Sequence, residues 1–351
     1  MNKKLLTLAF GAALAVPLVV QADTTAYAHV QFELANIDNG TDADMYVRDV
    51  ERGRIGLTGN HDLGDGLEGF ATVEFDYVGG NDDSEFGDAT DTTTTDAANP
   101  ADPLTYHSHE VRVRGNALRV REISAGLKGG FGYFEIGTLK SAYKYTGGYN
   151  YDAFVATTLE ARGNYGMSGG DMGHNSFINN AMAYKNKFGP VDVWVTYSLD
   201  ATDTDGDTIA DDGQMTYAFS FNSGKFEAFL SGVDRGTSLS DYSSNKLGGK
   251  FNLSNNMAVL GQYEMNDLNG TDRDYLFLGF QMKQGKKLFA FQYGMRDTDD
   301  GVDNDADGTY MSLGAIHKYN NAVSLFAGYK TKEGEGNLDE TILSAGLRVD
   351  I

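Results

Sequence analysis

The chain has no cysteine among its 351 residues, so neither a disulfide framework nor a cysteine-ligated metal site is possible. Basic residues are scarce, with 28 Lys and Arg against 50 Asp and Glu, and the net charge of −22 argues against nucleic-acid binding. Mean hydropathy is −0.38, and beyond residue 22 no apolar run approaches the roughly 20 residues that a membrane-spanning helix needs. These absences leave a soluble acidic protein, or a β-barrel whose apolar residues alternate with polar ones.

The N-terminal segment has the pattern of an export signal. Lys3 and Lys4 precede an apolar stretch from Leu5 to Val20, which ends on a small-x-small cleavage pattern. We therefore expect residues 1–22 to be a cleaved signal peptide and residues 23–351 to form one barrel domain. Without the two lysines the expected mature chain carries 26 basic and 50 acidic residues, a net charge of −24.

The rest of the sequence alternates between apolar and polar residues with a period of two. From Leu67 to Tyr77 one face is mainly apolar, while the other carries Glu68, Glu74 and Asp76. Roughly ten residues is the length that a tilted strand needs to cross a bilayer. The pattern predicts sixteen antiparallel strands, at 25–34, 52–59, 67–77, 119–128, 131–138, 179–187, 191–199, 214–222, 225–233, 246–253, 257–264, 273–282, 287–294, 309–318, 322–329 and 339–351.

Short turns alternate with long connections along the predicted strands. The long connections are expected at 35–51, 78–118, 139–178, 200–213, 234–245, 265–272, 295–308 and 330–338. Short turns at one end and long loops at the other are typical of an all-β, transmembrane antiparallel barrel of the outer membrane. A soluble β-sandwich is the alternative, but sixteen strands with one apolar face each would have little to pack against except lipid.

Several motifs resemble those of the general porins of the Gram-negative outer membrane. Residues Arg54 to Gly59, followed by Asp62 to Leu67, are similar to the family pattern R-[IL]-G-[FL]-x-G and DLG-x-GL. Residues Arg121 to Gly132 resemble R-x-A-x-V-G-L-x-G-x-FG, and residues 179–197 resemble the next strand pair. The C-terminal residues 344–351 are similar to the signal that the outer-membrane assembly machinery reads.

The resemblance implies a homotrimer of sixteen-stranded barrels that lies among outer-membrane lipids and lipopolysaccharide. It also implies that the third long loop, 139–178, folds into the pore and that acids on it face basic residues on the wall. Arg54 and Arg121 match the family's wall arginines, and Lys185 lies near a third basic position.

On the loop itself, the acids expected at the pore constriction are Asp152 and Glu160, because they lie near its middle. The PEFGG motif of enterobacterial porins is absent from this loop, so these two acids are chosen by position rather than by motif.

A later segment carries an acidic repeat that is typical of calcium loops. Asp303, Asp305 and Asp307 follow the D-x-D-x-D-G spacing of the first half of an EF-hand loop, in which alternate side chains supply oxygen ligands. The twelfth position is Gly314 rather than Glu, so the closing bidentate ligand is missing. A calcium site and a solvated acidic loop therefore both remain open, and no other cofactor is expected.

The function expected from these features is passive diffusion of ions and small hydrophilic solutes, with a preference for cations because the loops are acidic. No G-x-S-x-G motif is present, and the pattern does not indicate an enzyme. A substrate-specific channel is an alternative, which the tyrosines at 143, 145, 149 and 151 keep open. A structural or adhesive barrel with a closed pore is another.

Overall fold

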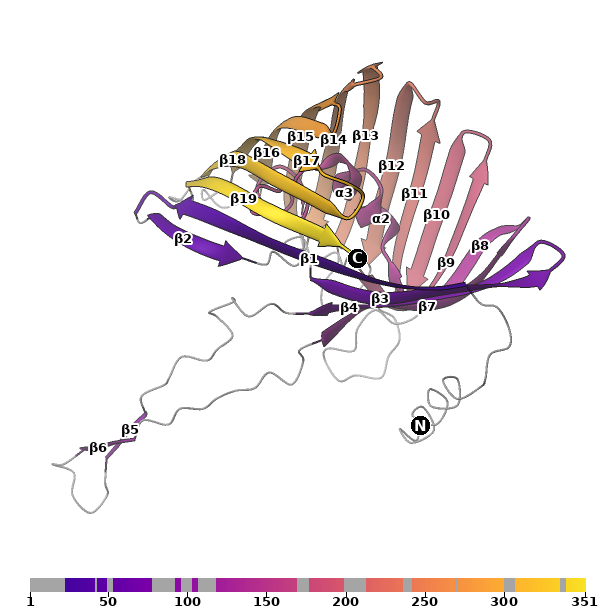
Figure 1. Cartoon of the computed structure of the whole chain (residues 1–351), viewed down its shortest axis with the longest axis horizontal. Helices are drawn as coiled ribbons and strands as arrows, with labels where there is room; N and C mark the ends of the chain where they lie inside the picture. Colours follow the sequence, from indigo (N-terminus) through magenta and orange to yellow (C-terminus); the bar gives the residue numbers. More distant parts are fainter. Residues whose placement is uncertain are drawn as a thin grey trace.

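The computed structural model describes residues 23–41, 43–48, 53–77, 92–95, 103–106, 118–168, 177–198, 213–235, 242–268, 270–299, 307–334 and 339–351. One antiparallel sheet dominates it and curls around a central space (Figure 1). Its strands are β1 (Asp23–Asp38), β2 (Ala43–Arg48), β3 (Arg54–Gly64), β4 (Leu67–Tyr77), β7 (Leu118–Gly129), β8 (Gly132–Lys140), β9 (Phe177–Phe188), β10 (Val191–Ser198), β11 (Gln214–Asn222), β12 (Phe226–Arg235), β13 (Tyr242–Ser254), β14 (Met257–Leu268), β15 (Thr271–Gln284), β16 (Lys287–Asp299), β17 (Gly308–Lys318), β18 (Val323–Gly334) and β19 (Glu340–Asp350). A separate two-stranded sheet joins β5 (Thr92–Thr95) to β6 (Pro103–Tyr106).

The sheet closes on itself because β1 pairs with the last strand, β19, from His29 to Asp38. On its other side β1 pairs first with β3 and then with β2, so β2 and β3 lie end to end and occupy one position in the barrel. Counted in this way, the closed barrel has the sixteen predicted antiparallel strands. Closure joins the two ends of the sheet through β1 and β19, whereas β2 is paired on its β1 side alone among the described strands.

Burial alternates along the strands as the sequence predicts. On β1, Gln31 and Glu33 are buried on the inner face, whereas Phe32 and Leu34 are both 49% exposed on the outer face. The same outward apolar and inward polar pattern recurs on β19, where Ser344 is buried and Leu343 is exposed. An apolar outer belt of this kind is what lipid solvates, and a polar inner face suits a water-filled interior.

Among the described residues, no helix is long and apolar enough to cross a membrane.

The predicted loop at 35–51 is wrong, because strands occupy most of it. β1 continues to Asp38, and β2 begins at Ala43, which leaves a short hairpin. The predicted loop at 265–272 is also too long, since β14 reaches Leu268 and β15 begins at Thr271. At 265–272 the side chains lose their apolar alternation while the backbone ladder continues, whereas β2 keeps an alternation that is only six residues long. Ladder hydrogen bonds need no apolar face, so strands extend past the segment that lipid solvates.

The chain leaves the wall after β8 and enters the barrel interior. Two short helices, α2 (Ala142–Tyr145) and α3 (Gly148–Tyr151), begin this inward segment (Figure 1). Ser141 starts α2 as its N-cap and accepts a hydrogen bond from the Lys144 backbone N–H. We call the described part of this segment, residues 141–168, the constriction loop.

Candidate pore constriction

Backbone hydrogen bonds hold the constriction loop against one part of the inner wall. Loop N–H groups donate to wall side chains at four points: Ala142 to Thr216 (3.0 Å), Gly148 to Gln262 (2.7 Å), Ala153 to Gln292 (2.7 Å) and Thr158 to Glu33 (2.9 Å). These partners come from β11, β14, β16 and β1, so the loop follows the wall from β11 round to β1. The inward polar side chains of these strands satisfy loop groups that would otherwise be buried without partners.

Glycines on the inner face of three neighbouring strands let the loop approach the wall closely. They are Gly294 on β16, Gly314 on β17 and Gly328 on β18. A Cβ atom at these positions would lie 2.3 Å from the Gly166 Cα, 2.8 Å from the Phe154 ring and 2.7 Å from a Leu159 methyl carbon, respectively. Each distance is far below van der Waals contact, so the loop position depends on these missing side chains.

The remaining wall, on β3, β4 and β7, carries a cluster of paired charges. Arg121 is only 9% exposed and contacts two carboxylates, with its Nε 2.9 Å from Glu74 Oε1 and one Nη 2.9 Å from Asp76 Oδ1. Arg119 reaches the other oxygen of Asp76 at 3.0 Å. Arg54 lies opposite Asp76 in the β3–β4 register. The structure therefore places both predicted wall arginines next to Asp76, with Arg121 ion-paired to it and Arg54 opposite it in the strand register.

A β-bulge explains why Arg121 faces inward. The register between β4 and β7 shifts at this point, since Glu74 pairs with Glu122 and Phe75 pairs with Val120. Arg121 is the extra residue, and both it and Glu122 are buried. A bulge places two consecutive side chains where a regular strand would place one, which here concentrates charge on the inner wall.

Aromatic rings connect the constriction loop to this charged wall. The guanidinium carbon of Arg121 lies 4.5 Å from the ring centroid of Phe177, and that ring is 6.0 Å from the ring of Tyr145. Tyr145 also packs 5.2 Å from Tyr149 and lies 5.9 Å from the Lys140 ammonium. Burial raises the pKa of the Tyr145 hydroxyl to about 12, although the positive charge of Arg121 opposes that rise. The narrow region is therefore lined by tyrosines and arginines together.

The third predicted wall residue, Lys185, lies apart from this group. It faces inward on β9, as the alternation predicts, but only three residues before the end of the strand at Phe188. Its ammonium pairs with Glu135 Oε1 at 2.6 Å and lies 4.2 Å from the Trp194 ring. The structure therefore places Lys185 near the short-turn rim, away from Arg121.

The two predicted loop acids occupy different environments. Asp152 is 3% exposed, and its carboxylate accepts hydrogen bonds from the N–H groups of Phe154 (2.9 Å) and Ala161 (2.8 Å). Burial, reinforced by the nearby charge of Glu160, raises the pKa of Asp152 to about 6. Glu160 is less buried and pairs with Arg162 at 2.9 Å. Asp152 thus holds the loop turn together, while Glu160 and Arg162 form an ion pair nearer the surface of the loop.

The proposed calcium ligands fall mostly outside the described residues. Asp303 and Asp305 lie there, and Asp307 accepts a hydrogen bond from the Thr298 backbone N–H at 2.7 Å. Within the described part of the chain, no group of three His, Asp or Glu side chains could hold a metal ion.

Sequence reasoning did not identify several charged residues at the constriction. Glu74 and Asp76 were recognisable as inward by alternation, but nothing in their spacing showed that both would pair with Arg121. Arg162 and Lys246 gave no signal, because only the fold of the loop brings them near each other.

The closed sixteen-strand barrel, its apolar outer belt and its inward loop define a transmembrane β-barrel channel. The chain belongs to the Gram-negative porin family, whose model matches residues 7–337. This membership makes the protein an outer-membrane channel. No curated protein matches the chain in sequence.

Solved porin structures share the fold at low sequence identity. An anion-selective porin from Comamonas acidovorans is 18% identical, with a TM-score of 0.69 over 94% of this chain and 100% of that chain. OmpF of Salmonella typhi, in complex with daunomycin, is 14% identical, with a TM-score of 0.69 over 93% and 97% of the two chains. The trimer form of OmpT from Vibrio cholerae is 16% identical, with a TM-score of 0.61 over 94% and 99%. These likenesses establish the barrel architecture.

Proposed function

We propose that this porin is a passive diffusion channel for ions and small hydrophilic solutes, with a preference for cations at low salt. The charged wall cluster supports this proposal most directly. The constriction loop takes its hydrogen-bond partners from β11 round to β1, while Arg121, Glu74 and Asp76 on the other side pair among themselves. Paired charges fixed on the inner wall create a local electric field in the pore. Such a field orients water and polar solutes and requires no catalysis.

Two opposing charge distributions decide ion selectivity. The expected mature chain carries −24, and its predicted long loops are acidic, so the mouth concentrates cations. Arg54 and Arg121 oppose this at the constriction. The Debye length is about 30 Å at 0.01 M salt and about 3 Å at 1 M, so the mouth charges act on the pore only at low salt. Cation preference should therefore be clear at low salt and shrink as salt rises.

Reversal potentials in KCl gradients at two mean concentrations test the proposal. A unit charge about 5 Å from a passing ion changes its energy by about 0.8 kcal/mol in water, or roughly fourfold in local concentration. Arg121→Gln should therefore raise the cation-to-anion permeability ratio several-fold, and Arg54→Gln should act in the same direction. Lys185→Gln is the matched control, because it removes an inward basic residue near the rim and should change the ratio little. Anion preference in wild-type channels at low salt would contradict the mouth-charge argument.

A substrate-specific channel is the second candidate, and the aromatic lining favours it. Phe177 lies beside Arg121 and packs edge-on against Tyr145, which in turn packs against Tyr149, and such rings bind planar or sugar-like solutes better than an aliphatic lining would. In the same recordings, block of the current by one solute at low concentration would favour this candidate. Silent channels would instead favour a structural or adhesive barrel whose pore is closed.

The assembly and the surroundings of the barrel belong to the same proposal. We infer a homotrimer that is exported with cleavage after residue 22 and that contacts outer-membrane lipid and lipopolysaccharide through its apolar belt. The exposed outward side chains of β1 and β19, including Phe32, Leu34 and Leu347, support a surface made for lipid or for another barrel.

A further inference from the structure

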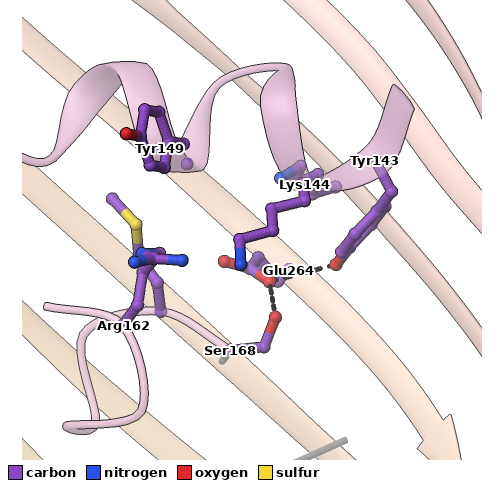
Figure 2. A pocket seen from close by; sticks show the side chains of 9 residues that line it. Tyr143, Lys144, Tyr149, Arg162, Ser168 and Glu264 are labelled. Atoms are coloured by element: carbon purple, nitrogen blue, oxygen red, sulfur yellow. Dashed lines mark hydrogen bonds between the residues drawn. The ribbon is translucent and has the colours of Figure 1, made fainter. Parts of the chain in front are cut away.

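A small cavity lies between the constriction loop and the wall, and Tyr143 and Tyr149 help to line it. Its volume is about 20 Å³, and it is bounded by Lys144 and Arg162 from the loop and by Lys246 and Glu264 from β13 and β14. Figure 2 shows the side chains of Lys144 and Arg162 pointing into the same space, with Glu264 beside them. The channel function described above makes no use of this cavity.

Lys246 is a buried cation opposite Glu264 in the β13–β14 register, and its ammonium has no hydrogen-bonded partner among the described residues. The residue is 2% exposed, and its ammonium lies 4.2 Å from the ring centroid of Tyr143. Within the described part of the chain, no oxygen accepts a hydrogen bond from its Nζ. A buried ammonium has three donors to satisfy, and leaving them unpaired is costly.

Arg162, which also lines the cavity, carries a second unsatisfied donor. One of its terminal nitrogens binds Glu160 at 2.9 Å, but its Nε is buried and finds no acceptor among the residues that the structure describes. Its guanidinium also lies 5.4 Å from the Tyr149 ring. Two cationic donors, one from the wall and one from the loop, thus lack acceptors around the same space.

The carboxylate that lines the cavity does not fill this need. Glu264 Oε2 accepts hydrogen bonds from the hydroxyls of Tyr143 (3.0 Å) and Ser168, and its Oε1 accepts one from Gln262 at 2.6 Å. Three bonds from neutral donors already occupy its oxygens. Lys144, Arg162 and Lys246 line the cavity against Glu264, and Glu160 pairs with Arg162, so a net charge of about +1 remains there at neutral pH.

We propose that this cavity binds a monatomic halide ion, chloride in the organism, between Lys246 and Arg162. About 20 Å³ is enough for one particle near the size of a water molecule, such as a halide ion. A chloride ion accepts hydrogen bonds from every side, whereas a water molecule would also bring hydrogens toward the cations. The ion would tie the loop, through Arg162, to the wall, through Lys246, and so help to fix the width of the constriction.

Diffraction from crystals of the intact protein grown in sodium bromide tests the site directly, since bromide gives an anomalous signal. An anomalous peak between Lys246 and Arg162 in the wild type is the expected result, and it should disappear in Lys246→Met, which keeps the length of the side chain but removes its charge. Lys330→Met is the matched control. Lys330 is equally buried, but its ammonium has partners in Glu340 (3.2 Å) and Asn164 (3.1 Å), so the bromide peak should persist. A wild-type cavity without an anomalous peak would overturn the proposal.

Melting temperatures in solution test the same site and need no crystals of the variants. At equal ionic strength, chloride should raise the melting temperature of the wild type above its value in gluconate, which is too large for the cavity. Lys330→Met should keep this difference, and Lys246→Met should lose it. An equal chloride effect in Lys246→Met and the wild type would mean that the ion binds elsewhere, which also overturns the proposal.

Discussion

Replacing Gly294 by alanine should push the constriction loop into the pore. The new Cβ would lie 2.3 Å from the Cα of Gly166, whereas ordinary carbon contacts begin near 3.4 Å. Both atoms belong to backbone, or are fixed directly to it, so no side-chain rotation can relieve the contact. The loop must therefore move by about 1 Å away from β16, and overpacking of this kind costs about 1–3 kcal/mol.

The direction of the movement determines the readout. The loop lies between β16 and the charged wall, so displacement from β16 carries it toward Arg121 and narrows the passage. Single-channel conductance should fall in Gly294→Ala, and the melting temperature should fall by several degrees. Gly59→Ala is the control, because the nearest atom to its Cβ would be the Thr24 hydroxyl at 3.7 Å, and both quantities should stay at wild-type values. Unchanged conductance in Gly294→Ala would refute the claim that this glycine sets the loop position, and increased conductance would mean that the loop moves away from the charged wall.

Three further outcomes are expected. Because the pKa of Asp152 is raised to about 6, the folded loop keeps a proton that the unfolded chain releases above about pH 4. The contribution of Asp152 to stability should therefore be full below pH 4 and fall by about 3 kcal/mol as pH rises through 6. Melting temperatures should decline less over this pH range in Asp152→Asn than in the wild type. The proposed trimer should migrate as an oligomer in SDS at room temperature and as a monomer after boiling, and one mobility under both conditions would argue against it. If calcium binds at Asp303, Asp305 and Asp307, changing all three to Asn should lower the melting temperature only when calcium is present, and identical titration curves would leave a solvated loop.

The strands were predictable where lipid solvates one face of the sheet. Leu67 to Tyr77 forms β4 with the bounds that the alternation predicts, because its outward residues are apolar or small and its inward residues, apart from Phe70, are polar. The prediction is wrong at 43–48, where Ala43, Met45 and Val47 alternate with polar side chains over only six residues, all of them exposed. There the pairing with β1 determines the structure, and pairing leaves no trace in the side-chain pattern.

The site was predictable only in part, for a related reason. Family motifs and alternation together located Arg54 and Arg121 on the inner wall. The interior of the loop has no period, so position alone did not show that Asp152 would be buried or that Arg162 would approach Lys246. Contacts between a loop and a distant strand depend on the closed fold, which a local pattern does not contain.

The barrel closes only when β1 pairs with β19, so assembly cannot be completed before the last strand is available. The backbone of Ala28 exchanges two hydrogen bonds with Ile351, at 2.9 and 2.8 Å, and His29 contacts Asp350 across nearly the whole length of the chain. Until β19 has been synthesised and exported, β1 therefore has one unpaired edge that can capture any other strand. Contacts of such sequence separation also form slowly. A newly exported chain must thus be shielded from its neighbours until its two ends meet, and its last residues decide when that protection can end.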